Sequence, residues 1–253
     1  MTRLALVLAL LLVAAPAAAD TPYELYAAGK YEGAIRAGSD AGDAPGYATA
    51  ARAAMAIAAE KAVPCMECLQ RAEKLARKAI TVDGRNVAAR VYLAATLGYE
   101  ARIVGLMTAK MRGYPDEAKA QLDKALSIDA DDPWALAARG GWNVEVVRAG
   151  GAFLASMIYG ATLKAGFADF DKAFAVEPDN IALRYQYALS LSALDIETYR
   201  RKVEDVLRKV VKTKPQTEYE NFARWRAQEL VDALRDDDMP EFRRLLKRDQ
   251  GYP

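Results

Sequence analysis

A short pattern of small and apolar residues recurs four times along this 253-residue chain. In each copy, a small or branched residue is followed four positions later by an apolar residue and seven positions later by another small or branched residue. This spacing places three side chains on one face of an α-helix. Small side chains there let a second helix pack closely. The copies are Ala72-Ala76-Ala79, Ala118-Leu122-Ala125, Gly166-Phe170-Ala173 and Val203-Leu207-Val210.

Residues that favour the end of a helix follow most copies of the pattern. Five positions after the last residue of each copy stand Gly84, Ala130, Pro178 and Pro215. Proline and glycine end helices, so each copy is predicted to be the second helix of a helix-turn-helix unit. We expect helices near residues 47–62, 66–82, 86–112, 115–128, 133–150, 179–193, 196–212 and 217–235, with a loop at 38–46.

The turns between these helices resemble those of tetratricopeptide repeats. Asp129-Ala130-Asp131-Asp132-Pro133-Trp134 and Glu177-Pro178-Asp179-Asn180 match the turn between repeats, and Gly29, Tyr31, Ala34 and Ile35 fit the middle of one further unit. The resemblance covers residues 22 to 215 in patches. It implies an all-α, tetratricopeptide-like solenoid with lengthened helices over residues 20–215. Residues 216–253 are expected to be capping helices of the same domain, with the tail around Phe242 and Leu245 docked or frayed.

The lengthened helices, together with export, also resemble the T component of TRAP-type solute transporters. That component is a periplasmic helical-repeat protein that works beside a substrate-binding subunit. This likeness implies a transporter subunit as the partner of the chain.

The first 19 residues have the pattern of a secretory signal peptide. Arg3 supplies positive charge, Leu4 to Val13 is apolar, and Ala17-Ala18-Ala19 precedes Asp20. Small residues at that point are typical of a cleavage site. The sequence therefore predicts cleavage after Ala19 and a periplasmic protein. The apolar run is too short to span a bilayer, and no stable membrane span is expected.

The charge balance argues against a nucleic-acid partner. Without Arg3, the chain has 34 basic and 34 acidic residues. A protein that binds nucleic acid generally needs a basic surface. We therefore predict no nucleic-acid partner. The composition favours helix throughout, because alanine is abundant.

Cys65 and Cys68 form the one reactive motif in the sequence, a Cys-x-x-Cys after Pro64. One interpretation is a local disulfide formed on export. The second is a thiol-disulfide oxidoreductase, since a helix N-terminus lowers a thiol pKa. The third is a metal site, although two cysteines do not complete a zinc site.

The chain contains no histidine. This excludes Ser-His-Asp and Cys-His catalysis, and no glycine-rich phosphate loop is present. We therefore expect no enzymatic activity, no cofactor and no metal.

Two segments supply candidate groove residues. First helices of such repeats line the concave surface, and aromatic and methionine side chains there suit an apolar ligand or a partner helix. The alternative is that these side chains fill the core where long helices cross. The candidates are Tyr99, Arg102, Trp142, Glu145, Arg148, Phe153, Met157 and Tyr159.

These observations favour a non-catalytic periplasmic binding or scaffold protein that docks an envelope protein, peptide or transporter partner. The first alternative is a binding protein for a small apolar ligand or lipid. The second is an oxidoreductase that uses Cys65 and Cys68, and self-association into a homo-oligomer is a further possibility.

Overall fold

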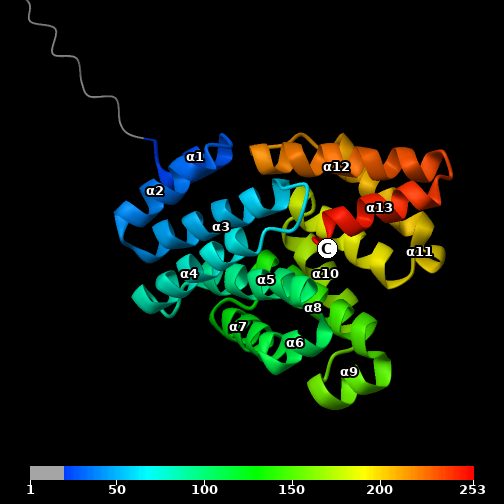
Figure 1. The fold of residues 1–253 in the computed structure, drawn as a ribbon, viewed down its shortest axis with the longest axis horizontal. Helices are drawn as coiled ribbons and strands as arrows, with labels where there is room; N and C mark the ends of the chain where they lie inside the picture. Colours follow the sequence, from blue (N-terminus) through cyan, green and yellow to red (C-terminus); the bar gives the residue numbers. More distant parts are fainter. Residues whose placement is uncertain (1–19) are drawn as a thin grey trace, which may run out of the picture.

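The computed structural model describes residues 20–253, and the all-α prediction is confirmed there: thirteen α-helices and no strand (Figure 1). The helices are α1 (Pro22–Ala27), α2 (Tyr31–Ala41), α3 (Ala44–Glu60), α4 (Met66–Val82), α5 (Val87–Val104), α6 (Leu106–Met111), α7 (Tyr114–Ile128), α8 (Pro133–Gly150), α9 (Ala152–Tyr159), α10 (Leu163–Val176), α11 (Ile181–Lys212), α12 (Glu218–Arg235) and α13 (Met239–Asp249).

Short polar side chains start the helices that matter most for the candidate site. Asn86, Asp132 and Asn180 precede α5, α8 and α11, and each side-chain oxygen accepts a hydrogen bond from a backbone N–H three residues later, at 2.7 to 2.9 Å. An N-cap of this kind satisfies an N–H group that the helix itself leaves without an acceptor. These three side chains therefore fix where the helices begin, and two of them, Asp132 and Asn180, belong to the predicted turns.

The helices pack in two ways. Each of α3, α5 and α8 contacts the outer helix that follows it, which is α4, α7 or α10. The same helices also contact one another in the order α3, α5, α8 and α11. They therefore form an inner row, covered on one side by the outer helices. At the ends of the chain, α1 contacts α12, and Figure 1 shows these two helices along the same edge.

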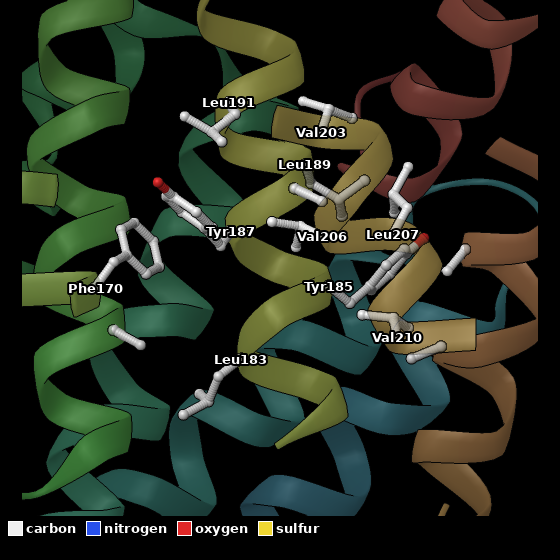
Figure 2. Packing of buried hydrophobic residues seen from close by; sticks show 14 of the residues in the cluster. Phe170, Leu183, Tyr185, Tyr187, Leu189, Leu191, Val203, Val206, Leu207 and Val210 are labelled. Atoms are coloured by element: carbon white, nitrogen blue, oxygen red, sulfur yellow. The ribbon is translucent and has the colours of Figure 1, made fainter. Parts of the chain in front are cut away.

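All twelve residues of the recurring pattern are buried. Phe170 of α10 faces Tyr187 of α11 with the ring centroids 4.6 Å apart, and Val203, Leu207 and Val210 line the same core (Figure 2). Glycine lets α8 and α10 approach most closely, because a Cβ on Gly140 would lie 2.9 Å from the carbonyl oxygen of Gly166. The pattern thus marks the faces along which helices meet.

Two expected elements differ from the structure. The helix expected over 86–112 is two helices, because Gly105 takes φ 81° and ψ 160° and breaks it. This is a backbone conformation that only glycine adopts readily. The loop expected over 38–46 is reduced to Gly42 and Asp43, since Gly38 is helical and packs against Gly46 of α3.

The helices expected over 179–193 and 196–212 run on as α11, with a break at Asp195. The Asp195 carboxylate accepts a hydrogen bond from the Thr198 N–H at 3.1 Å, which caps the second half. After α12 and α13, the end of the chain docks: Phe242 is fully buried, and Gln250 donates a hydrogen bond to the Leu189 carbonyl. Across residues 20–253, no helix combines the length and the apolar character needed to cross a bilayer.

Candidate binding groove

A groove of about 670 Å³ lies along the inner row of helices. The helices α3, α5, α8 and α11 all contribute to its wall, and the side chains that they contribute recur at helical spacing. This spacing turns one face of each helix towards the groove. The main stripes are Arg52, Met55, Ala56 and Ala59 of α3, Ala95, Gly98, Tyr99 and Arg102 of α5, Ala138, Gly141, Trp142 and Glu145 of α8, and Leu183, Gln186 and Ser190 of α11.

Small residues create the volume of the groove. The stripes contain Ala56 and Ala59 on α3, Gly98 on α5 and Gly141 on α8. A Cβ atom added at Gly98 would meet no other atom within 4 Å, so α5 leaves open space at that point. Residues from α6 and α9 border the same groove, as do Tyr219 of α12 and Tyr252 near the C-terminus.

Arg52 places a positive charge in the groove wall. Its guanidinium carbon lies 4.4 Å from the ring centroid of Tyr26 and 4.9 Å from that of Trp134. Within residues 20–253, the titratable side chains beside it are the neutral tyrosines Tyr23, Tyr26 and Tyr92, and no carboxylate forms an ion pair with it. Cation–π contacts attract the charge but do not neutralise it, and guanidinium carries five N–H donors. Arg52 is therefore a partly buried cation without an anionic partner.

A charged cluster lies elsewhere in the wall. The Arg148 guanidinium donates two hydrogen bonds to the Glu145 carboxylate, at 2.9 and 2.7 Å. The Tyr252 hydroxyl donates to the same carboxylate at 2.8 Å and also contacts Arg148. Arg102 lies 3.8 Å from Glu145 and donates a hydrogen bond to the Gln250 carbonyl. One carboxylate therefore faces two guanidinium groups, and the cluster ties the C-terminus to α5 and α8.

Burial alone would raise the pKa of Glu145, but the hydrogen bonds from Arg148 and the charge of Arg102 outweigh it. The pKa falls from its ordinary value of 4.5 to about 2. A carboxyl group with a lowered pKa stabilises the fold above its unfolded pKa, and this contribution is lost as the pH falls towards the folded pKa. The cluster should therefore weaken between about pH 4.5 and pH 2.

We predict that Glu145→Gln flattens the acid dependence of stability. The parent should lose on the order of 3 kcal/mol at most through this group between those pH values, whereas glutamine does not titrate. The measurement is urea unfolding over that pH range. Glu197→Gln, at a surface ion pair with Arg243, is the matched control and should follow the parent. Equal acid slopes for the parent and Glu145→Gln would contradict the assignment.

Six of the eight residues predicted for a groove line it. Tyr99, Arg102, Trp142, Glu145, Arg148 and Tyr159 are in its wall. Trp142 and Tyr159 form an edge-to-face pair with centroids 6.1 Å apart, and the Trp142 ring N–H donates a hydrogen bond to the Pro115 carbonyl. Phe153 and Met157 lie outside the groove wall, on the exposed side of α9.

The sequence reasoning missed Arg52, Tyr92, Trp134 and Tyr252, which also line the groove. Arg52 carries the one signal that was visible: it stands as a single charge within the alanine-rich run from Ala48 to Ala59. A charged side chain in such an apolar run is costly to bury, so its presence indicates a specific role. Tyr252 carried no signal, because only the folding of the C-terminus brings it to α8.

Cys65 and Cys68 are joined by a disulfide at the start of α4. The Cys65 sulfur also accepts a hydrogen bond from the Cys68 N–H, so the bridge closes the first turn of the helix. Residues 20–253 contain no cluster of three potential metal ligands among histidine, cysteine, aspartate and glutamate. The cysteines therefore close a turn away from the main groove.

A family model described as "Regulator of microtubule dynamics protein 1-3" (RMD1-3) matches residues 39–235. This match covers most of the chain and all of the inner helices. The chain belongs to the RMD1-3 family. Among curated proteins, none matches the chain.

Membership of the RMD1-3 family corrects the earlier identification. The assignment to the tetratricopeptide-repeat proteins, with its likeness to the TRAP T component, is wrong. Two features suggested the tetratricopeptide assignment: small side chains at helix crossings, and capped Asp-Pro and Pro-Asp-Asn turns. Closely packed helical pairs of other families use the same features. They therefore do not identify one family. The predicted signal peptide and its cut after Ala19 lie outside the described residues, so export stays a prediction.

Proposed function

We propose that the chain is a non-catalytic binding protein, a helical solenoid whose concave face holds an elongated apolar ligand with an anionic group. The observation that carries this proposal is the groove of about 670 Å³ with Arg52 in its wall. Small-molecule sites are typically mainly apolar clefts of about 300–1,000 Å³ with a few polar groups that fix the orientation of the ligand.

The shape of the wall supports an elongated ligand. Stripes from four helices run along the groove, and most of their residues are alanine, glycine or aromatic. Burying an apolar chain against them is favourable in proportion to the area removed from water. The four helices of the wall together offer such an area.

Arg52 supports an anionic group on that ligand. The other two arginines of the wall, Arg102 and Arg148, already face Glu145. Arg52 instead lies among the side chains of Tyr26, Tyr92 and Trp134 and faces no carboxylate within residues 20–253. A carboxylate or phosphate placed there would form charge-assisted hydrogen bonds, which are stronger than neutral ones.

The description of the matched family concerns regulation of microtubule dynamics and names no catalysis. A binding protein is consistent with that description. Docking of a protein partner stays a prediction from the sequence, and no contact among residues 20–253 favours it over a small ligand. The oxidoreductase alternative likewise stays a prediction, since the disulfide lies outside the groove wall.

Fluorescence titration with two probes tests the proposal. The first probe, cis-parinaric acid, is a long apolar chain with a carboxylate, and the second, N-phenyl-1-naphthylamine, is apolar and uncharged. Both should bind. Arg52→Gln should weaken parinaric acid binding roughly 10- to 100-fold, because a hydrogen bond to a charged group contributes about 1.5–3 kcal/mol. The same variant should leave the uncharged probe nearly unchanged.

Arg36→Gln is the matched control, since Arg36 is exposed on α2 and lies outside the groove wall. It should bind both probes as the parent does. Failure of the parent to bind either probe would overturn the proposal. If Arg52→Gln lost the same affinity for both probes, the role assigned to the charge of Arg52 would be overturned, but the groove would remain the binding site.

A further inference from the structure

Exposed large apolar side chains are concentrated on two short helices of this molecule. Twelve such side chains are exposed in residues 20–253, and seven of them lie on the two short helices α6 and α9. Met107, Met111 and Phe153 are 71%, 84% and 77% exposed. We call this surface the α6–α9 face; its other members are Leu106, Leu154, Met157 and Ile158. A concentration of exposed apolar side chains on a folded protein usually marks an interaction site.

The two helices are built in the same way. Gly105 precedes α6 with φ 81° and ψ 160°, and Gly151 precedes α9 with φ 77° and ψ 154°. Each glycine ends a helix of the inner row and turns the chain into a short helix at the lower edge of Figure 1. In each short helix one alanine, Ala109 or Ala155, is buried as the anchor. The apolar side chains beside it remain in solvent.

The two chain segments that carry this face contain basic residues and no acidic ones. No acidic residue occurs between Glu100 and Asp116 or between Glu145 and Asp169, the two segments that contain α6 and α9. The basic residues in these segments are Arg102 and Arg148, which face Glu145 in the groove wall, and Lys110, Arg112 and Lys164, which form no ion pair within residues 20–253. In a chain whose acidic and basic residues are nearly balanced, this pattern is local. It is complementary to a surface that is both apolar and negatively charged.

The α6–α9 face is continuous with the groove. Leu106 and Met107 of α6 and Leu154 and Ile158 of α9 border the groove. A partner that covers this face therefore also lies against one side of the groove. The partner can cover this face whether or not a ligand occupies the groove.

We propose that the α6–α9 face docks on the surface of an anionic lipid bilayer, with the methionine and phenylalanine side chains inserted among the acyl chains. Short apolar segments flanked by lysine and arginine bind membrane interfaces in two ways. Their apolar side chains are buried among the lipids, and their positive charges are attracted to anionic headgroups. The inference goes beyond the binding of a ligand in the groove and can fail independently of it.

A single reporter cysteine tests the contact in the full chain. Met111→Cys and Met157→Cys are each labelled with bimane, without reductant, so that the Cys65–Cys68 disulfide stays closed. Val82→Cys, at an exposed site at the end of α4, is the matched control. Vesicles of phosphatidylcholine and phosphatidylglycerol should shift bimane emission to the blue at residues 111 and 157 and not at residue 82. Pure phosphatidylcholine should give a smaller shift.

Unlabelled variants test the energetics. Met107→Ser combined with Phe153→Ser should lower vesicle partitioning on the order of tenfold or more, with circular dichroism used to check the fold. Gly98→Trp places an indole in the groove and should leave the bimane shifts intact. Failure of ligand binding in the groove can therefore be distinguished from failure of membrane docking by the α6–α9 face.

Three results would overturn the proposal. The first is the absence of a shift at both residues 111 and 157. The second is an equal shift at residue 82. The third is a shift produced by raising the protein concentration without vesicles, together with a doubled mass in light scattering, which would assign the face to a second copy of the chain.

Discussion

Gly98→Trp should abolish most ligand binding while leaving the protein folded. Gly98 lies in the groove wall in the middle of α5, and a Cβ there would meet open space. An indole group at this position would occupy the groove itself. Because the indole takes volume that a ligand would fill, binding of cis-parinaric acid and of N-phenyl-1-naphthylamine should weaken on the order of 10- to 100-fold, or about 1.4–2.8 kcal/mol.

The matched control is Gly98→Ala, which adds one methyl group and leaves the rest of the volume free. Both probes should bind to it as they bind to the parent. Fluorescence titration gives the affinities, and thermal unfolding shows whether each variant is folded. Binding at parental affinity in a folded Gly98→Trp protein would show that the probes bind elsewhere and would remove the groove as the site.

Gly38→Ala should destabilise the protein strongly, by roughly 3 kcal/mol, the upper end of the range for overpacking. A Cβ at Gly38 would lie 2.3 Å from the carbonyl oxygen of Gly46 and 3.0 Å from its carbonyl carbon. Both atoms belong to the backbone of α3, so no side-chain rotation relieves the contact. The helices α2 and α3 would have to move apart.

Gly98→Ala again provides the comparison, because it is the same chemical change in another helix. Alanine is favoured over glycine in a helix by about 1 kcal/mol, and Gly98 has free space. The two variants should therefore change the free energy of unfolding in opposite directions, measured by urea denaturation. A neutral or stabilising Gly38→Ala would mean that α2 and α3 do not meet at this pair of glycines.

The sequence predicted the candidate site in part. Six of the eight predicted groove residues line the groove, because Tyr99, Arg102, Trp142 and Glu145 follow the helical period on the inner helices. Phe153 and Met157 follow the same apolar pattern but are exposed. Periodicity reports that a helix has an apolar face; it does not report whether anything covers that face.

The break at Gly105 illustrates a second limit. The apolar and charged pattern of residues 86–112 is helical throughout, and a glycine within a helix is tolerated at a modest cost. Gly98 and Gly105 are both glycines in that pattern, but only Gly105 takes a positive φ. The neighbouring packing decides between the two outcomes, so the sequence alone could not place α6.

The sequence by itself determined the local structure: the all-α class, the capped starts of α5, α8 and α11, and the buried faces along which helices meet. These follow from interactions within a few residues along the chain, such as the side chain of an N-cap or the spacing of small residues. Tertiary structure alone decided the functional surface. Arg52 meets Trp134, and Tyr252 meets Glu145, only after the helices have packed. Such contacts depend on the angles and distances between helices, which many similar patterns of small residues could satisfy in different ways.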